Sequence, residues 1–318
     1  MNSNDILAKL KNVKIGVLYG GLSSEREVSV ESGKAVLNSL RRQNLKAVGI
    51  DADRDIADKI KKAGIDVAYI ILHGPMGEDG TVQGMLELMG IPYTCSGVFA
   101  SSASMDKDIS KKLFKCMGVP TPDWTIIKRF GVFKDIKKYP VVVKPVSQGS
   151  TFGVTIVREA CQFAAAVKEA FRYDSEVMAE DFISGKEITV GVLGGKSLPV
   201  IEIIPNGEFY DFKSKYQKGG SRHIIPAKIN HDVYLRAQDY AEKIFEFFKC
   251  KTLCRVDMII DEHDEIWVID NNTIPGMTAT SLLPEACKSI GCDFDDLVLK
   301  VIEDALYDGN KEKEPLCL

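Results

Sequence analysis

Hydrophobic positions in the first hundred residues form short blocks separated by amphipathic stretches. Three blocks have the length of buried strands, namely residues 13–21, 46–51 and 66–74. Residues 23–42 bring their apolar side chains to one side, as a helix does: Val28, Val36, Leu37 and Leu40. Residues 80–90 predict a second helix. This alternation of strand and helix predicts a parallel sheet covered by helices, with ligands bound at the carboxyl ends of its strands.

Farther along, residues 104–120 predict a helix whose apolar residues recur every four positions: Met105, Ile109, Leu113 and Met117. Ser104 can cap its start, and Gly118 with Pro120 ends it. Residues 140–157 predict two strands around a glycine-containing loop. A helix at 164–173 and a strand, a turn and a strand within 176–195 complete a small α+β module.

The last third of the chain predicts a long helix and a strand pair. The helix spans 234–249 and has an apolar stripe made of Ala237, Ala241, Ile244 and Phe248. The strands span 253–260 and 265–270. With 318 residues the chain is longer than one core usually holds. We therefore expect α/β and α+β domains at residues 1–98, 99–184 and 185–318.

Charge and composition exclude several classes of protein. The formal charge of −4 and the pI near 5.7 give no basic surface for nucleic acid. No apolar run has the length of a membrane span, and the first residues lack a signal-peptide core. These features predict a cytoplasmic protein without nucleic-acid or membrane partners.

Eight cysteines are scattered along the chain. The closest pairs are Cys250 with Cys254 and Cys287 with Cys292, and no histidine lies near enough in sequence to complete a zinc site. Without export signals, reduced thiols are favoured over disulfides or a metal site.

An acidic hairpin follows the long helix. A turn centred on Glu262 and His263 would put Arg255 opposite Asp270, with Asp257 diagonal to it and Asn272 on the same face. One interpretation is a buried salt bridge in which Arg255 neutralises both acids, which leaves Asn272 unused. The other is a Mg²⁺ site, because two carboxylates and an amide oxygen are hard ligands. The hairpin alone leaves both open.

The glycine-containing loop follows a lysine that ends an apolar strand. Lys144 precedes Gly149 and Gly153, whose backbone can approach a ligand and form an anion-binding nest. A plain β-hairpin is the alternative, although a lysine in a buried strand needs an anionic partner. Glu180 and Glu187 flank a later turn and could accept hydrogen bonds from a nucleobase or ribose, or could simply be solvated.

Seven segments, in this order, resemble the signatures of D-alanine–D-alanine ligases: GGLSSEREVSVESG, LHGPMGEDGTVQGMLELMGIPYTCSGV, SMDKDISKKL, VVVKPVSQGSTFGV, FYDFKSKY, RVDMII and NNTIPGMT. These are ATP-grasp enzymes of peptidoglycan synthesis, and the resemblance covers about residues 13 to 305. It implies a three-domain ATP-grasp fold, with a Rossmann-like N-terminal sheet and ATP between two antiparallel sheets. It further implies that ATP and D-alanine are the substrates, with two Mg²⁺ or Mn²⁺ ions, a D-alanyl phosphate intermediate and a homodimer.

The resemblance also assigns roles to individual residues. The metal ligands would be Asp257, Asp270 and Asn272. ATP would be bound by Lys107, Lys144, Ser150, Glu180, Phe182, Ile183, Glu187 and Lys215. The first D-alanine would meet Glu25 and His73, and its developing oxyanion would meet Arg255 and the amide of Gly276. The second D-alanine's carboxylate would meet Ser281 and Leu282. Tyr216 would close the site towards Ser150 and Glu25, within a lid at residues 213–220.

Two positions depart from the family pattern. Asp270 stands where a glutamate usually bridges both metal ions, and Cys95 stands where glycine is usual. Ligases that make D-alanyl-D-serine or D-alanyl-D-lactate are alternatives, although the segment KSKY at 213–216 disfavours the lactate type. An ATP-binding sensor without turnover is an alternative of another class. It is disfavoured because Glu25, Arg255 and the other acyl-site residues are retained.

Overall fold

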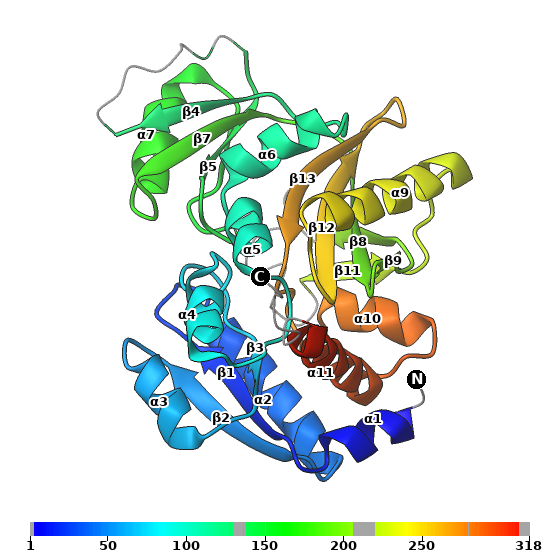
Figure 1. Cartoon of the computed structure of the whole chain (residues 1–318). Coiled ribbons are helices and arrows are strands. Elements are labelled where there is room, and N and C mark those ends of the chain that lie inside the picture. The colour runs from blue at the N-terminus through cyan, green and yellow to red at the C-terminus, as the bar shows by residue number, and fades with distance from the viewer. Residues whose placement is uncertain are drawn as a thin grey trace, which may run out of the picture.

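The structure is a computed structural model that describes residues 3–129, 136, 138–149, 151–205, 220–278 and 280–311. Figure 1 shows three groups of strands, each covered by helices. Each group is a separate sheet, with three, four and six strands.

The first sheet is parallel, as its strand and helix alternation predicts. Its order is β2-β1-β3, formed by β1 (Lys14–Gly20), β2 (Lys46–Ala52) and β3 (Val67–Ile70). The helices that accompany it are α1 (Ser3–Leu10), α2 (Arg26–Arg42), α3 (Ile56–Ala63) and α4 (Thr81–Met89). The predicted stripe of α2 is buried, including Val36 and Leu40. The loops after β1 and β3 therefore meet at one edge of this sheet.

The helix predicted at 104–120 is two helices, and its apolar stripe is only partly buried: Met105 is buried and Leu113 and Met117 pack against the core, but Ile109 does not. Helix α5 (Val98–Met105) ends before Asp106, which caps α6 (Lys107–Cys116) by accepting hydrogen bonds from the amides of Asp108 and Ile109. Ser104 lies inside α5. Ile109 is 41% exposed, whereas the buried face of α6 carries Lys107, Ser110, Lys111 and Phe114. The spacing of the apolar residues does not identify the buried face of α6, because this helix turns lysines inward, towards carboxylates that are distant in sequence.

The second sheet is antiparallel, with the order β4-β7-β5-β6. Its strands are β4 (Trp124–Lys128), β5 (Val141–Pro145), β6 (Thr155–Val157) and β7 (Glu176–Asp181). Val141 and Val143 pack with helix α7 (Ala160–Ala170) in one hydrophobic cluster. Because side chains alternate along a strand, Val142 and Lys144 point to the opposite face.

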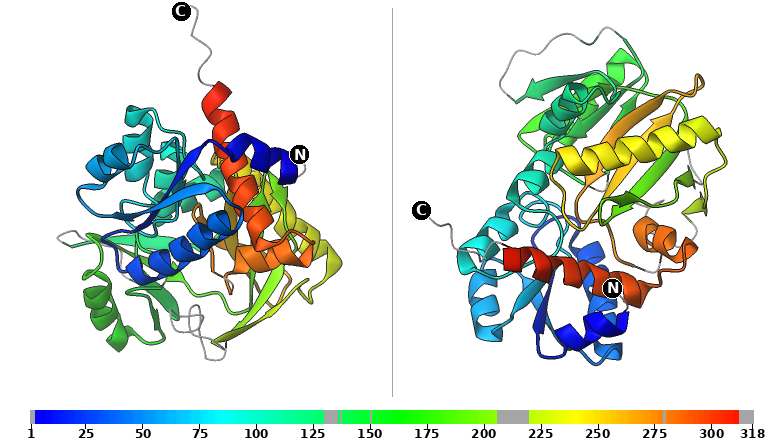
Figure 2. Two further views of the ribbon diagram at one scale, coloured as in Figure 1. Left: turned by 90° about the horizontal axis from the view of Figure 1, so that it is seen from below. Right: turned by 45° about the vertical axis from the view of Figure 1, so that its right-hand side comes forward.

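The third sheet has the order β11-β10-β8-β12-β13, with β9 paired to β8. Its strands are β8 (Lys186–Leu193), β9 (Lys196–Ser197), β10 (Ile201–Pro205), β11 (Ser221–Ile224), β12 (Leu253–Ile260) and β13 (Ile266–Asn272). Helix α9 (His231–Phe247) covers one face, as the right-hand view of Figure 2 shows. Its predicted stripe, Ala237, Ala241, Ile244 and Phe248, is fully buried there.

The hairpin β12–β13 forms as predicted, but in another register. Asp257 is opposite Asp270 and Arg255 is opposite Asn272, with a register shift between Asp257 and Met258. The turn is centred on His263 and closed by the hydrogen bond from the amide of Asp261 to the carbonyl of Glu265. Beyond it, β13 carries one extra residue. A bulge of this kind reverses the side-chain alternation, so Ile266 and Val268 are buried on the α9 face whereas Asp270 turns away from it.

Two C-terminal helices, α10 (Leu282–Ser289) and α11 (Phe294–Lys311), return to the first sheet. Helix α11 contacts α1 and α2, and the left-hand view of Figure 2 shows it beside α1. One hydrophobic cluster joins Ile15, Val36, Leu283 and Val301. The division at residues 98/99 and 184/185 remains a prediction, since this cluster combines side chains from both ends of the chain.

Every cysteine that the structure describes is a free thiol, and Cys95, Cys250, Cys254 and Cys287 are buried. Cys95 has φ of 70°, in the left-handed region that favours glycine. The glycine that is usual at this position would therefore adopt the same backbone with less strain. Over the described ranges, no helix combines the length and apolar character needed to cross a membrane.

Candidate active site

A cavity of about 300 Å³ lies between the second and third sheets. The second sheet contributes Val142, Lys144 and Glu180, and the third sheet contributes Glu187, Asp257, Ile259 and Asp270. The remaining lining includes Lys107 of α6, Gly149 and Thr151 of the glycine loop, and Phe182 and Ile183 between β7 and β8. Eight residues given roles by sequence resemblance thus line one cavity: Lys107, Lys144, Glu180, Phe182, Ile183, Glu187, Asp257 and Asp270.

Glu180 forms the charged wall of this cavity and is only 2% exposed. Its Oε2 accepts a hydrogen bond of 2.6 Å from Lys144 Nζ, and its Oε1 accepts one from Lys111 Nζ. Burial acts to raise the pKa of Glu180, but the charges of Lys144 and Lys111 outweigh it and lower that pKa. Glu180 is therefore an ionised, buried carboxylate rather than a solvated surface glutamate.

Lys111 was missed by the sequence analysis. It is fully buried, and besides Glu180 it donates to Thr121 Oγ1 at 2.7 Å. Burial lowers the pKa of Lys111 to about 8, against the opposing charge of Glu180. The available signal was its spacing of four residues from Lys107, which puts both lysines on one face of α6.

The acids of the hairpin face the same cavity. Arg255 donates two hydrogen bonds to Asp257, at 2.9 and 2.8 Å, and Thr189 Oγ1 donates a third at 2.6 Å. Lys107 Nζ lies 4.0 Å from Asp270 Oδ1. The expected pairing of Arg255 opposite Asp270 is therefore corrected: the turn centred on His263 and the bulge each shift the register by one residue, which puts Asp257 opposite Asp270. Each acid has its own cationic neighbour.

Asn272, which the salt-bridge interpretation left unused, has a structural contact. Its Oδ1 accepts a hydrogen bond of 2.9 Å from the amide of Ile274 and so shapes the turn after β13. Within the described ranges, no three His, Cys, Asp or Glu side chains gather as a metal site. The hairpin instead offers two carboxylates and one amide oxygen. This donor set fits Mg²⁺ when a bound phosphate and water supply the other oxygens.

A second polar cluster lies at the edge of the first sheet, where β1 and β3 end. Glu25 precedes α2 and is 4% exposed, and His73 follows β3 and is 5% exposed. Ser23 Oγ joins the two loops by donating to the carbonyl of His73 at 2.6 Å. His73 Nε2 is buried and has no hydrogen-bond partner among the described residues. A buried ring nitrogen of this kind is a position for a ligand atom.

Glu78, also missed by the sequence analysis, sets the charge of this cluster. Its Oε2 accepts from the amide of Gly74 at 2.6 Å, and its Oε1 lies 3.8 Å from His73 Nδ1. Burial acts to lower the pKa of His73, but the neighbouring carboxylates of Glu78 and Glu25 raise it overall through their charges. Arg255 opposes this rise through its own charge, so the cluster interacts electrostatically with the hairpin.

Two close approaches connect the cluster to the rest of the site. A β-carbon on Gly149 would lie only 2.6 Å from Glu25 Oε2, so the glycine loop touches the Glu25 carboxylate. A β-carbon on Gly191, the cross-strand neighbour of Arg255, would lie 2.7 Å from Leu283 Cδ1. Helix α10 therefore begins beside the hairpin. A side chain at either position would push the facing side chain, Glu25 or Leu283, out of its present place.

The start of α10 holds the residues predicted to bind a second carboxylate. Ser281 precedes the helix, its Oγ accepts from the amide of Thr278 at 3.0 Å, and Leu282 is buried. A β-carbon on Gly276 would be 3.0 Å from Ser281 Oγ. Asn272, Gly276, Ser281, Leu282 and Arg255 lie outside the lining of the cavity. Ser150, Lys215, Tyr216 and the predicted lid, except Gly220, lie outside the described residues.

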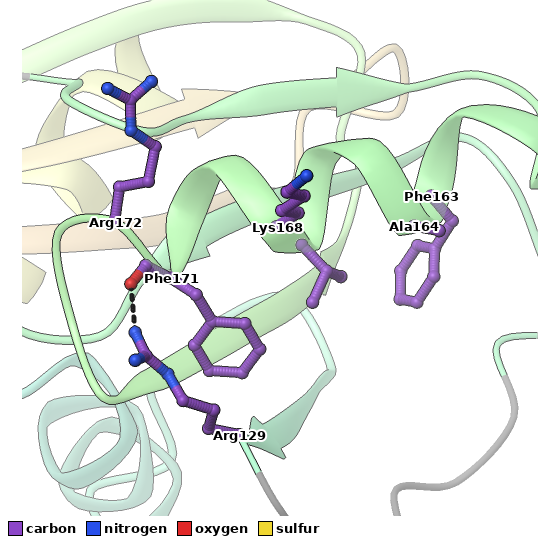
Figure 3. A pocket seen from close by; sticks show the side chains of 7 residues that line it. Arg129, Phe163, Ala164, Lys168, Phe171 and Arg172 are labelled. Carbon is purple, nitrogen blue, oxygen red and sulfur yellow. Dashed lines mark hydrogen bonds between the residues drawn. The ribbon is translucent and has the colours of Figure 1, made fainter.

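A larger hollow of about 830 Å³ lies elsewhere, between Arg129 and helix α7 (Figure 3). Its lining is mostly apolar, including Phe163, Val167 and Phe171, and contains no carboxylate. Arg129 donates to the carbonyl of Phe171 and lies over its ring. None of the predicted site residues lines this hollow.

Comparison with known proteins places the chain in a family. The profile described as D-ala D-ala ligase C-terminus matches residues 113–303, and the one described as D-ala D-ala ligase N-terminus matches 51–96. The D-alanine–D-alanine ligase of Citrifermentans bemidjiense is 48% identical over 297 residues, covering 93% of this chain and 97% of the relative. That of Syntrophotalea carbinolica is 46% identical over 298 residues, covering 93% and 97%.

Solved structures agree. The D-alanine–D-alanine ligase from Bacillus anthracis complexed with ATP has a TM-score of 0.82 and 34% identity, covering 94% of this chain and 99% of that one. The VanG D-Ala:D-Ser ligase from Enterococcus faecalis has a TM-score of 0.77 and 31% identity, covering 92% and 99%. The two antiparallel sheets that face each other across the cavity form the ATP-grasp fold. The chain belongs to the D-alanine–D-alanine ligase family.

The raised pKa of His73 predicts how stability depends on pH. A histidine with a raised pKa in the folded state stabilises the fold fully below its unfolded pKa, and this stabilisation disappears as the pH rises through the folded pKa. Wild type should therefore exceed His73→Gln in free energy of unfolding most at about pH 5.5, and least at about pH 8.5. Urea denaturation across this range measures the difference. His263→Gln, at the exposed hairpin turn, is the control, and a difference independent of pH would contradict the assignment.

Proposed function

We propose that this protein uses ATP to join two molecules of D-alanine into D-alanyl-D-alanine for peptidoglycan synthesis. The observation that carries the proposal is that three features lie close together. They are the cavity between the sheets, the buried pair of Glu25 and His73, and the Arg255 side chain. Gly149, which lines the cavity, contacts Glu25, and Arg255 donates to Asp257, which lines the same cavity. Relatives at 48% and 46% identity with the name D-alanine–D-alanine ligase support the same activity.

In this proposal ATP occupies the cavity. Glu180 and Glu187 accept hydrogen bonds from adenosine, and Phe182 and Ile183 line the same part of the cavity. Lys107 and Lys144 meet the phosphates, since both residues line the cavity and lysine is a common phosphate ligand. Ser150 and Lys215 complete the phosphate contacts. The ATP in the Bacillus anthracis complex supports the choice of nucleotide.

The first D-alanine binds with its ammonium group at Glu25, with His73 nearby. Its carboxylate oxygen attacks the γ-phosphorus of ATP, ADP leaves, and a D-alanyl phosphate forms. This activation is needed because a carboxylate is a poor electrophile. Arg255 and the amide of Gly276 would stabilise the negative charge that develops on the acyl oxygen.

The second D-alanine binds with its carboxylate at Ser281 and Leu282, where α10 begins. Its amine, after losing a proton, attacks the acyl carbon, the C–N bond forms and inorganic phosphate leaves. Water would hydrolyse the acyl phosphate, so the site must exclude it during this step. Tyr216, with Ser150 and Glu25, is proposed to close the site.

Asp257, Asp270 and Asn272 would hold Mg²⁺ or Mn²⁺, two ions by family resemblance. Bound ions would neutralise the phosphate charge during transfer. Arg255 and Thr189 already hold Asp257 in place, and this fixes the orientation of one proposed ligand before any ion arrives. Asp270 is one methylene shorter than the usual glutamate, so its reach to a second ion is reduced.

The competing activities are less well supported. Relatives that are 48% and 46% identical over more than nine-tenths of the chain carry the name D-alanine–D-alanine ligase, whereas the D-Ala:D-Ser ligase structure is 31% identical, within the 27–36% of the solved D-alanine–D-alanine ligases. A sensor without turnover would need the nucleotide cavity but not the buried Glu25 and His73 pair. We also propose a homodimer, because Leu88 of α4 is 93% exposed and Phe99 of α5 is 56% exposed, and these helices adjoin.

Product analysis tests the proposed reaction directly. Incubation with ATP, Mg²⁺ and saturating D-alanine should yield D-alanyl-D-alanine and one phosphate per dipeptide, measured by mass spectrometry and phosphate release. Parallel reactions with D-serine or D-lactate as the second substrate test the alternatives. Absence of dipeptide under saturating conditions would exclude the ligase activity.

Gly149→Ala should weaken binding of the first D-alanine. The new β-carbon would lie 2.6 Å from Glu25 Oε2, and the carboxylate, as the end of a side chain, must move away. Loss of a charge-assisted hydrogen bond raises the half-saturating D-alanine concentration by about 10- to 100-fold. Steady-state kinetics measure it, with melting curves to verify folding. Gly84→Ala, where the nearest atom is 3.7 Å away, is the control. Unchanged D-alanine dependence would contradict the role of Glu25.

Asp270 variants separate the metal site from a structural salt bridge. Asp270→Glu should keep or raise turnover and lower the Mg²⁺ concentration needed for half-maximal rate, because the longer side chain reaches a second ion more easily. Asp270→Ala should remain folded, since Lys107 also donates to the carbonyl of Gln148 at 2.7 Å. Its turnover should fall by about two orders of magnitude or more.

Mg²⁺ titrations and melting curves of both variants provide the measurement. Glu262→Ala, at the exposed turn of the same hairpin, is the matched control. A salt bridge alone would give the reverse result, with stability lost and the Mg²⁺ requirement unchanged. Normal ATP turnover in Asp270→Ala would remove this strand from the metal site.

A further inference from the structure

Lys111 stands behind the nucleotide cavity and does not line it. Its ammonium group is fixed from three sides. It donates to Glu180 Oε1 and to Thr121 Oγ1, and it lies 5.2 Å from the centre of the Trp124 ring. Thr121 Oγ1 in turn donates to the carbonyl of Val268 in β13 at 2.8 Å. The position of Lys111 is thus set by both sheets that enclose the cavity.

The buried positive charges around Glu180 outnumber the negative ones. Glu180 is a single carboxylate between two ammonium groups, with Lys111 on Oε1 and Lys144 on Oε2. A carboxylate oxygen can accept two hydrogen bonds, so each oxygen keeps capacity for a further donor. Glu180 lines the cavity, and a ligand can supply that donor.

We propose that Lys111 is a positioning residue for the nucleotide: it holds the Glu180 carboxylate ionised and oriented to accept a hydrogen bond from the exocyclic amino group of adenine. It also leaves Lys144 able to contact phosphate, because Glu180 keeps a second cation when Lys144 turns away. This inference rests on the proposed nucleotide site, and it makes a residue outside the cavity responsible for base selectivity.

A purely structural lysine would be hard to explain at this position. Replacing a buried ion pair by apolar side chains of similar size is often neutral or stabilising. Lys111 is fully buried on the inner face of α6, which it shares with the fully buried Phe114. Burying an ammonium group here costs desolvation free energy. The contact of Lys111 with Glu180, a carboxylate that lines the cavity, indicates a role in ligand binding that would explain why a lysine stands here.

The test compares Lys111→Met with Lys115→Met. Lys115 lies one turn farther along α6, 4.7 Å from the same Trp124 ring, but it pairs with the exposed Asp123 instead of Glu180. Calorimetry with Mg²⁺ measures the affinity for ADP and for IDP, in which an oxygen replaces the exocyclic amino group. Lys111→Met should weaken ADP binding about ten-fold or more and bring the ADP and IDP affinities together. Lys115→Met should match wild type.

The pH dependence supplies a readout that packing alone does not move. The charges of Lys144 and Lys111 lower the pKa of Glu180 against the effect of burial, so removing Lys111 raises that pKa. ADP affinity of Lys111→Met should therefore fall as the pH is lowered below neutral, whereas wild type should change less. A protonated Glu180 is a poorer acceptor for the amino group.

Several outcomes would overturn the inference. A folded Lys111→Met variant that binds ADP and distinguishes it from IDP like wild type would do so. If Lys111→Met does not fold, Thr121→Val removes one of the two acceptors that hold Lys111 and should reduce ADP selectivity in the same direction. Unchanged selectivity in Thr121→Val would then overturn it. Wild type that binds ADP but forms no dipeptide would refute the proposed ligase activity alone, because ADP binding needs no turnover.

Discussion

The buried carboxylate of Glu180 constrains most of the architecture around the cavity. A carboxylate that is 2% exposed needs compensating charge, and it receives two ammonium groups, from α6 and from β5. Thr121 extends this network to β13, where Val268 also donates its amide to the carbonyl of Pro120 at 2.9 Å. One charge thus fixes α6 and the two sheets relative to one another. The cavity lies between elements that this network links.

The β12–β13 hairpin places its acids on one face of a sheet whose other face is hydrophobic. Along β12, alternation alone suffices, with Val256 and Met258 under α9 and Arg255 and Asp257 towards the site. Along β13, Val268 and Asp270 are two residues apart and would share a face. The bulge separates them, so Val268 stays in the core while Asp270 lines the cavity.

Glycines then bring parts of different sheets into contact. Gly149 lets the loop of the second sheet touch Glu25 at the edge of the first, and Gly191 lets α10 pack against the strand next to Arg255. The proposed sites for nucleotide, first amino acid and second amino acid become neighbours through these two approaches. A side chain at either position would push Glu25 or Leu283 away and so separate these proposed sites.

The sequence by itself determined the strand and helix order, the parallel first sheet, the hairpin, the apolar stripes of α2 and α9, and the family. These follow from local periodicity and from motifs that keep their order along the chain. Only the tertiary structure decided the inner face of α6, the register of β12 with β13, the burial of Glu180 and the partner of Lys111. Lys111 and Glu180 are 69 residues apart, and the bulge depends on which face of the sheet α9 covers. A local pattern cannot reveal contacts whose energy comes from groups so distant in the chain.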